Sequence, residues 1–88
     1  MKNINNAKAM NEKELENVVG GISSNEAVNA AMRHAGVATG QARLAKCELD
    51  YEHGTQVYEI KFYCNGMEYE YDIDANSGAV LKAERDWD

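Results

Sequence analysis

Two cysteines and two histidines are the side chains best suited to nucleophilic or metal chemistry. They are Cys47, Cys64, His34 and His53. A cysteine nucleophile needs a histidine base within hydrogen-bonding reach, and a zinc site needs three or four ligands. Neither histidine is spaced as a member of a ligand pair, and no nucleophile–base pattern occurs. The sequence therefore predicts no catalytic residue, no metal site and no cofactor, and we expect a protein that is not an enzyme.

The run Asp72-Ile-Asp-Ala-Asn-Ser-Gly78 resembles the first half of a calcium-binding loop. Such a loop places glycine at its sixth position and glutamate at its twelfth. Here the glycine comes one residue late, and the twelfth position is Ala83. The run also continues a predicted strand from which Asp72 and Asp74 point outward. It therefore predicts a turn rather than a calcium site.

The clearest structural element around these residues is a β-hairpin centred on Asn65-Gly66. Asn-Gly favours the two positive-φ positions of a type I′ turn, so the register follows by counting outward. The strands span residues 55–64 and 67–74. Alternation predicts a buried face made of four cross-strand pairs: Cys64 with Met67, Phe62 with Tyr69, Ile60 with Tyr71, and Tyr58 with Ile73.

The opposite face of this hairpin is expected to be wet and mostly acidic. It carries Val57, Glu59, Lys61 and Tyr63 on one strand and Glu68, Glu70, Asp72 and Asp74 on the other. Glu59 should face Asp72, a like-charge pair that Lys46, predicted opposite Glu59, would relieve. A candidate binding face consists of Glu59, Tyr63, Glu68, Glu70, Asp72 and Asp74, with Tyr63 as its aromatic anchor. A face that serves only solubility is the alternative.

The remaining elements complete an α+β fold. Ser23 and Glu26 fit a capping box before an amphipathic helix at residues 24–35, which Gly36 ends. We expect strands at residues 43–50 and 79–84, with a turn at 51–54. The result is one N-terminal helix packed on a four-stranded antiparallel meander. Val28, Met32 and Ala35 of the helix are expected to cover the buried face of the sheet, to which Tyr69 belongs.

A disulfide between the two cysteines is not expected. If Asp50 pairs with Thr55, then Cys47 lies opposite Tyr58, six residues or about 20 Å from Cys64 along the strand. A disulfide requires Cα atoms within about 7 Å of each other. Both cysteines are on the buried face by alternation, so we expect two small core residues.

The charge distribution divides the chain into residues 1–21 and 22–88. The first part has three lysines and three glutamates, so the net charge of −6 belongs to the second part. An acidic domain argues against binding to nucleic acid. No apolar run approaches the roughly 20 residues of a membrane span.

Residues 24–84 resemble a PepSY domain. The resemblance rests on HAGV, ELDYEHG, VYEIKF, EYEYDIDANSG and VL, and its specific parts are Tyr58-Glu59 and the run from Tyr71 to Ala75 with Gly78. It implies a noncatalytic module of the kind found in propeptides of metallopeptidases and in bacterial envelope proteins. A secreted peptidase is the partner that the resemblance implies.

Residues 1–21 resemble a double-glycine leader, the signal read by ABC exporters that carry a papain-like cysteine peptidase. The resemblance places cleavage after Gly21 of the pair Gly20-Gly21, and recognition on Ala7, Met10, Glu14, Leu15 and Val18. The four apolar positions would occupy an arc of about 140° on a helix. Met10 and Asn11 stand where leucine and serine are commoner. The alternative is an ordinary glycine linker.

Three functions follow as hypotheses. The first is an exported, noncatalytic protein-binding module, with a peptidase inhibitor or modulator as its favoured form, secreted or in the cell envelope after leader removal from a cytoplasmic precursor. The second is a bacteriocin-like effector, which an acidic folded domain disfavours. The third is a cytoplasmic adaptor domain that is never cleaved.

Overall fold

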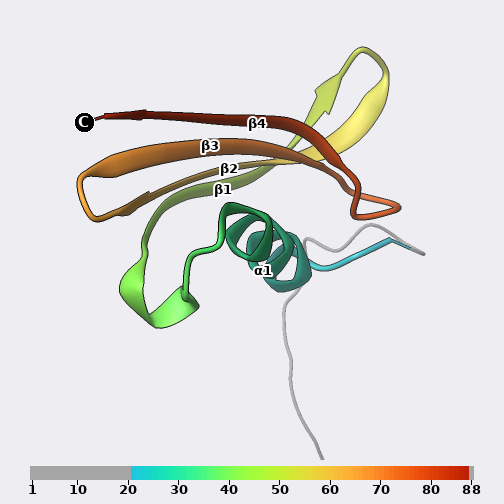
Figure 1. Cartoon of the computed structure of the whole chain (residues 1–88). Helices are drawn as coiled ribbons and strands as arrows, with labels where there is room; N and C mark the ends of the chain where they lie inside the picture. Colours follow the sequence, from blue (N-terminus) through green and yellow to red (C-terminus); the bar gives the residue numbers. More distant parts are fainter. Residues whose placement is uncertain (1–20, 88) are drawn as a thin grey trace, which may run out of the picture.

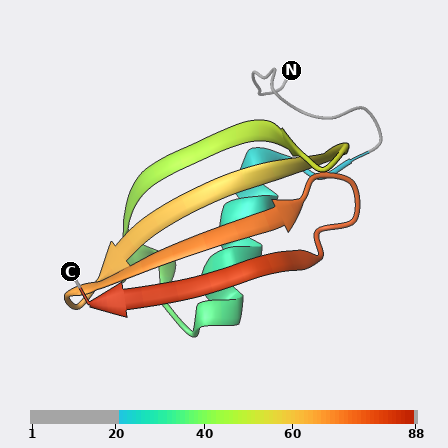
Figure 2. The same ribbon diagram turned by 90° about the horizontal axis from the view of Figure 1, so that it is seen from above.

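The computed structural model describes residues 21–87, which form one α-helix packed on a four-stranded antiparallel sheet (Figures 1 and 2). The strands follow one another in the sheet in chain order, and the helix lies across one face. This is the predicted α+β fold. The elements are α1 (Ser24–Ala35), a short 3-10 helix η1 (Thr39–Gln41), β1 (Arg43–Glu52), β2 (Thr55–Cys64), β3 (Met67–Asp74) and β4 (Val80–Trp87).

Helix α1 has the predicted bounds because both of its ends are capped. The Ser23 hydroxyl accepts a hydrogen bond from the Glu26 amide, and the Ser23 amide donates to the Glu26 carboxylate at 2.7 Å. Gly36 ends the helix with a φ of 75°, in the left-handed region that glycine tolerates. Neither helix in residues 21–87 has the length and apolar character to cross a membrane.

The β2–β3 hairpin has the predicted register. Asn65 and Gly66 have φ values of 54° and 78°, as a type I′ turn requires. All four expected pairs of the buried face are present, and Glu59 lies opposite Asp72 on the other face. The bounds of both strands are confirmed.

The predicted register between β1 and β2 is wrong by two residues from Lys46 to Glu52. His53 and Gly54 both have positive φ, 53° and 79°, so they form a two-residue turn and β1 extends to Glu52. Glu52 pairs with Thr55 in place of Asp50, and Cys47 lies opposite Ile60. A two-residue turn with both φ values positive matches the right-handed strand twist, which explains why it replaces the expected four-residue turn.

The corrected register still keeps the two cysteines apart. Cys47 lies opposite a residue four positions from Cys64, which corresponds to about 13 Å along the strand. No disulfide joins them. Cys64 is buried as predicted, whereas Cys47, on edge strand β1, is only half-buried.

Strand β4 is longer than predicted and irregular at its start. It spans Val80–Trp87, and its register against β3 shifts between Asp72 and Ile73, which leaves Leu81 between two paired residues. The preceding turn is held by Asp74, whose carboxylate accepts from the amides of Asn76 and Ser77 at 2.8 and 2.9 Å.

The core lies between α1 and the two central strands. It contains three buried helix residues and five buried residues of β2 and β3, with Ala75 beside them: Ala27, Ala31, Met32, Tyr58, Ile60, Phe62, Tyr71, Ile73. Phe62 stacks against Tyr69 and Tyr71, with ring centroids 4.9 and 6.0 Å apart. Tyr69, Val28 and Ala35, which were expected in the core, are only partly buried at its margin.

Candidate binding cleft on the acidic face

The sheet face opposite α1, called the acidic face below, carries a large excess of negative charge. The register places ten carboxylates on it: Glu48, Asp50, Glu52, Glu59, Glu68, Glu70, Asp72, Asp74, Glu84 and Asp86. Three lysines share the face, Lys46, Lys61 and Lys82, together with Arg43 opposite Tyr63. These four basic residues can neutralise only a minority of the carboxylates.

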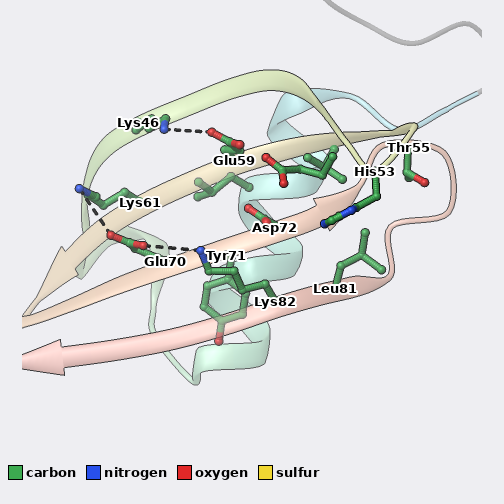
Figure 3. A pocket seen from close by; sticks show the side chains of 13 residues that line it. Lys46, His53, Thr55, Glu59, Lys61, Glu70, Tyr71, Asp72, Leu81 and Lys82 are labelled. Atoms are coloured by element: carbon green, nitrogen blue, oxygen red, sulfur yellow. Dashed lines mark hydrogen bonds and ion pairs between the residues drawn. The ribbon is translucent and has the colours of Figure 1, made fainter.

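The acidic face is hollowed by a cleft of about 580 Å³ (Figure 3). All four strands and the His53–Gly54 turn contribute to its lining. The lining residues are Lys46, Glu52, His53, Thr55, Val57, Glu59, Ile60, Lys61, Glu70, Tyr71, Asp72, Leu81 and Lys82. Antiparallel pairing brings these residues together from positions up to 36 apart in the sequence.

Val57 corrects the expectation of a uniformly wet face. Its position opposite Asp50 and Asp74 places it on the acidic face, yet it is 0% exposed. It lies on a central strand near the end of the sheet where His53 and Leu81 line the same cleft. The cleft therefore has an apolar residue buried at its base, which strict alternation of polar and apolar residues does not predict.

Three lysine–carboxylate interactions organise the rim of the cleft. Lys46 Nζ lies 3.0 Å from Glu59, the predicted ion pair, although the two residues are diagonal and Lys46 is opposite Lys61. Lys61 lies 3.6 Å from Glu70, and Lys82 approaches Glu70 at 3.9 Å from β4. Figure 3 draws these pairs along the sheet. Two of the three lysines thus converge on Glu70.

Three carboxylates of β1 and β2 lie close to one another. Oxygens of Asp50, Glu52 and Glu59 lie within 4.8 Å of one another. A hydrogen bond from Lys46 lowers the pKa of Glu59, and a hydrogen bond to Glu59 raises the pKa of Glu52. Burial raises the pKa of Asp72, which the charge of Glu59 reinforces. This cluster offers acceptors for the N–H donors of a cationic group.

Asp50 and Glu52 were missed by the sequence-based interpretation. The assumed four-residue turn ended the first strand at Asp50 and left Glu52 in a loop. The signal that identifies them is the dipeptide His53-Gly54, in which histidine tolerates the left-handed region and glycine adopts it freely.

The structure gathers only part of the predicted binding face in the cleft. Glu59, Glu70 and Asp72 line it, whereas Tyr63, Glu68 and Asp74 do not. The Tyr63 ring carries the Arg43 guanidinium at 4.8 Å from its centroid. Asp74 is committed to the β3–β4 turn, where two backbone amides lower the pKa of its carboxyl.

The histidines and the N-terminal segment complete the list of predicted sites. His34 Nδ1 lies 2.9 Å from the Tyr71 hydroxyl, at the end of α1, and His53 lines the cleft. The predicted leader-recognition residues Ala7, Met10, Glu14, Leu15 and Val18, and Gly20, lie outside the described residues. Gly21 is the first residue that the structure describes.

A helix laid across a four-stranded antiparallel meander is the architecture that the sequence motifs predicted. Residues 21–84 match the family described as "Peptidase propeptide and YPEB domain", PepSY. The chain therefore belongs to the PepSY family, whose domains are typically noncatalytic modules.

The chain is also similar to the "Uncharacterized protein Spy1430" of Streptococcus pyogenes serotype M6. The two are 38% identical over 61 residues, which are 69% of this chain and 47% of that protein. The chain thus spans about half the length of this curated relative. No solved structure matches the chain.

Proposed function

We propose that this protein is an exported, noncatalytic binding module that captures a basic segment of another protein, with a secreted peptidase as the favoured partner. A peptidase-containing ABC exporter would remove residues 1–21, and residues 22–88 would act outside the cell or in its envelope. The observation that carries the proposal is the cleft, where carboxylates outnumber lysines around a buried apolar base. Family membership supports the peptidase as partner.

The cleft suits a basic side chain better than a small metabolite. An arginine or lysine of the partner would place its donors among Glu52, Glu59 and Asp72, and its aliphatic stem would lie along the exposed side chain of Leu81. Charge complementarity of this kind speeds encounter and fixes orientation. Binding would also relieve the repulsion between carboxylates that the fold brings together.

Charge reversal within the cleft tests the binding proposal. The variant Glu52→Lys/Asp72→Lys alters two lining residues, and the control Glu48→Lys/Asp86→Lys makes the same charge change on the acidic face outside the cleft. The full chain is assayed for inhibition of peptidases secreted by the producing bacterium. We expect the cleft variant to lose at least about tenfold in inhibition, and the control to lose less than about threefold, because long-range attraction alone is screened by salt. Equal losses in both variants would contradict the role of the cleft.

Export and cleavage are tested separately. The protein is recovered from culture medium and its N-terminus is determined by mass spectrometry, with Ile22 expected as the first residue. A secreted form that begins elsewhere, or a protein found only in the cytoplasm, would contradict the leader. Growth inhibition of neighbouring bacteria without peptidase inhibition would favour the bacteriocin-like effector.

A further inference from the structure

Ile22, the residue that follows the proposed cleavage position, is built into the folded domain. Its amide donates to the Ala75 carbonyl at 2.9 Å, and its carbonyl accepts from the Tyr58 hydroxyl at 2.9 Å. Its side chain packs against the core and lies against Gly78, where an added Cβ would be 3.7 Å from Ile22 Cδ1. Both backbone groups and the side chain of Ile22 are therefore engaged.

Tyr58, which donates to Ile22, and Ser23, which follows Ile22 in the chain, are also held in place. Tyr58 is 1% exposed, so its hydroxyl is held by the core. Ser23 begins the capping box of α1, with its amide bound to the Glu26 carboxylate at 2.7 Å. Ile22 is therefore bound to Ala75 beside the β3–β4 turn, and the next residue, Ser23, already caps helix α1.

We propose that folding protects the Gly21–Ile22 bond, so that leader removal precedes folding of the domain. This inference rests on the proposed function, because it concerns the leader cleaved there. A cysteine peptidase adds its thiolate to the Gly21 carbonyl carbon. The bond to the Ile22 nitrogen then breaks as that nitrogen takes a proton and leaves as an amine, and water releases the Gly21 carboxylate from the thioester.

The folded domain obstructs this reaction at the leaving nitrogen. A peptidase must surround the scissile bond and bring its groups within about 3–3.5 Å of the reacting atoms. The Ile22 N–H instead donates to Ala75, and the Ile22 side chain is packed on Gly78. Once the bond is cut, the new α-amino group can donate to the same carbonyl, so the mature chain retains the anchor.

Cleavage of the full chain by a purified peptidase domain of a double-glycine exporter tests the order of events. Fragments 1–21 and 22–88 are quantified by mass spectrometry for the wild type and for Phe62→Asp, which places a charge at a fully buried position and unfolds the domain. We expect the unfolded variant to be cut at least about tenfold faster. Equal rates would overturn the inference, whereas failure to cut either chain would overturn the leader proposal.

Tyr58→Phe tests the anchor itself. Removing one hydrogen bond should raise the cleavage rate of the folded chain about fivefold. Cys64→Ala, at the opposite end of β2, is the control for a loss of global stability without loss of the anchor. The cleavage rate of this variant should rise only as far as its lower free energy of unfolding accounts for. An equal increase in Cys64→Ala at matched stability would overturn the role of the anchor.

Amide hydrogen exchange at Ile22 gives a readout that needs no peptidase. We expect strong protection in the folded full chain and reduced protection in Tyr58→Phe. Exchange at the rate of an unstructured amide in the wild type would overturn the inference, independently of whether the leader is ever cut.

Discussion

Val57→Ala is the sharpest test of the structure, because Val57 is buried on a face that alternation assigns to solvent. The side chain is 0% exposed. The substitution removes two buried carbons, worth about 1.6 kcal/mol at about 0.8 kcal/mol each. The cavity left behind raises the expected loss of unfolding free energy to about 2 kcal/mol. For a chain of this size the melting temperature should fall by about 8–16 °C.

The assay is urea unfolding of the full chain at pH 7, followed by far-ultraviolet circular dichroism. Leu81→Ala is the control, because Leu81 lines the same cleft but is 53% exposed, and its loss should stay below about 1 kcal/mol. If Val57 faced solvent as the alternation predicts, its truncation would change stability by less than about 0.5 kcal/mol. A result that small would refute the burial of Val57 and the apolar base of the cleft.

Three further predictions concern the helix cap, the β1–β2 turn and the acidic face. Ser23→Ala should cost about 1 kcal/mol in urea unfolding, because it removes one half of the capping box; an unchanged midpoint would contradict the cap. Gly54→Ala should cost about 1–2 kcal/mol, since the φ of 79° strains any residue with a Cβ; the control Gly40→Ala, where φ is not in that region, should be milder. Burial raises the pKa of Asp72 in the folded state, so the folded state favours the protonated carboxyl. The resulting contribution to the free energy of unfolding is fully present below the pKa of Asp72 in the unfolded chain and is lost as the pH rises through its pKa in the folded state. Asp72→Asn should therefore be more stable than the wild type at pH 7, by a few tenths of a kcal/mol, with the gain gone below about pH 3; a gain that persists at low pH would contradict this origin.

The central hairpin was predictable because each of its signals is local. Asn65-Gly66 specifies a turn geometry, and alternation on both sides specifies the register, so Tyr58 to Cys64 and Met67 to Ile73 are placed correctly. The helix is similar, since Ser23, Glu26 and Gly36 mark its ends within one turn. Both elements depend on contacts between residues close in sequence.

The β1–β2 register was not predictable with the same rule, because His53-Gly54 is a weaker signal than Asn-Gly. The two-residue error moved the partners of Lys46 to Glu52 but kept their side chains on the correct face, since side chains alternate with a period of two. The irregularity between Leu44 and Lys46 reduces the error to one residue at Arg43 and Leu44, which therefore lie on the opposite face from the predicted one. The Lys46–Glu59 ion pair survived for this reason, with Lys46 reaching diagonally across the strands. The prediction for Val57 failed for a different reason. Val57 is buried on a face that alternation assigns to solvent, and the cleft that it lines also includes His53 and Leu81, which lie far apart in the sequence.

The β3–β4 turn links the anchor of Ile22 to the cleft on the opposite face. The Asp74 carboxylate holds the turn, the Ala75 carbonyl receives the Ile22 amide on the helix side, and Leu81 reaches the cleft just beyond. A substitution at Asp74 is therefore expected to disturb both regions, although Asp74 lies on the acidic face. Loss of binding in such a variant would report on the turn as much as on charge. Glu52 and Asp72 separate the two effects, because they line the cleft without contributing the carboxylate that holds the turn.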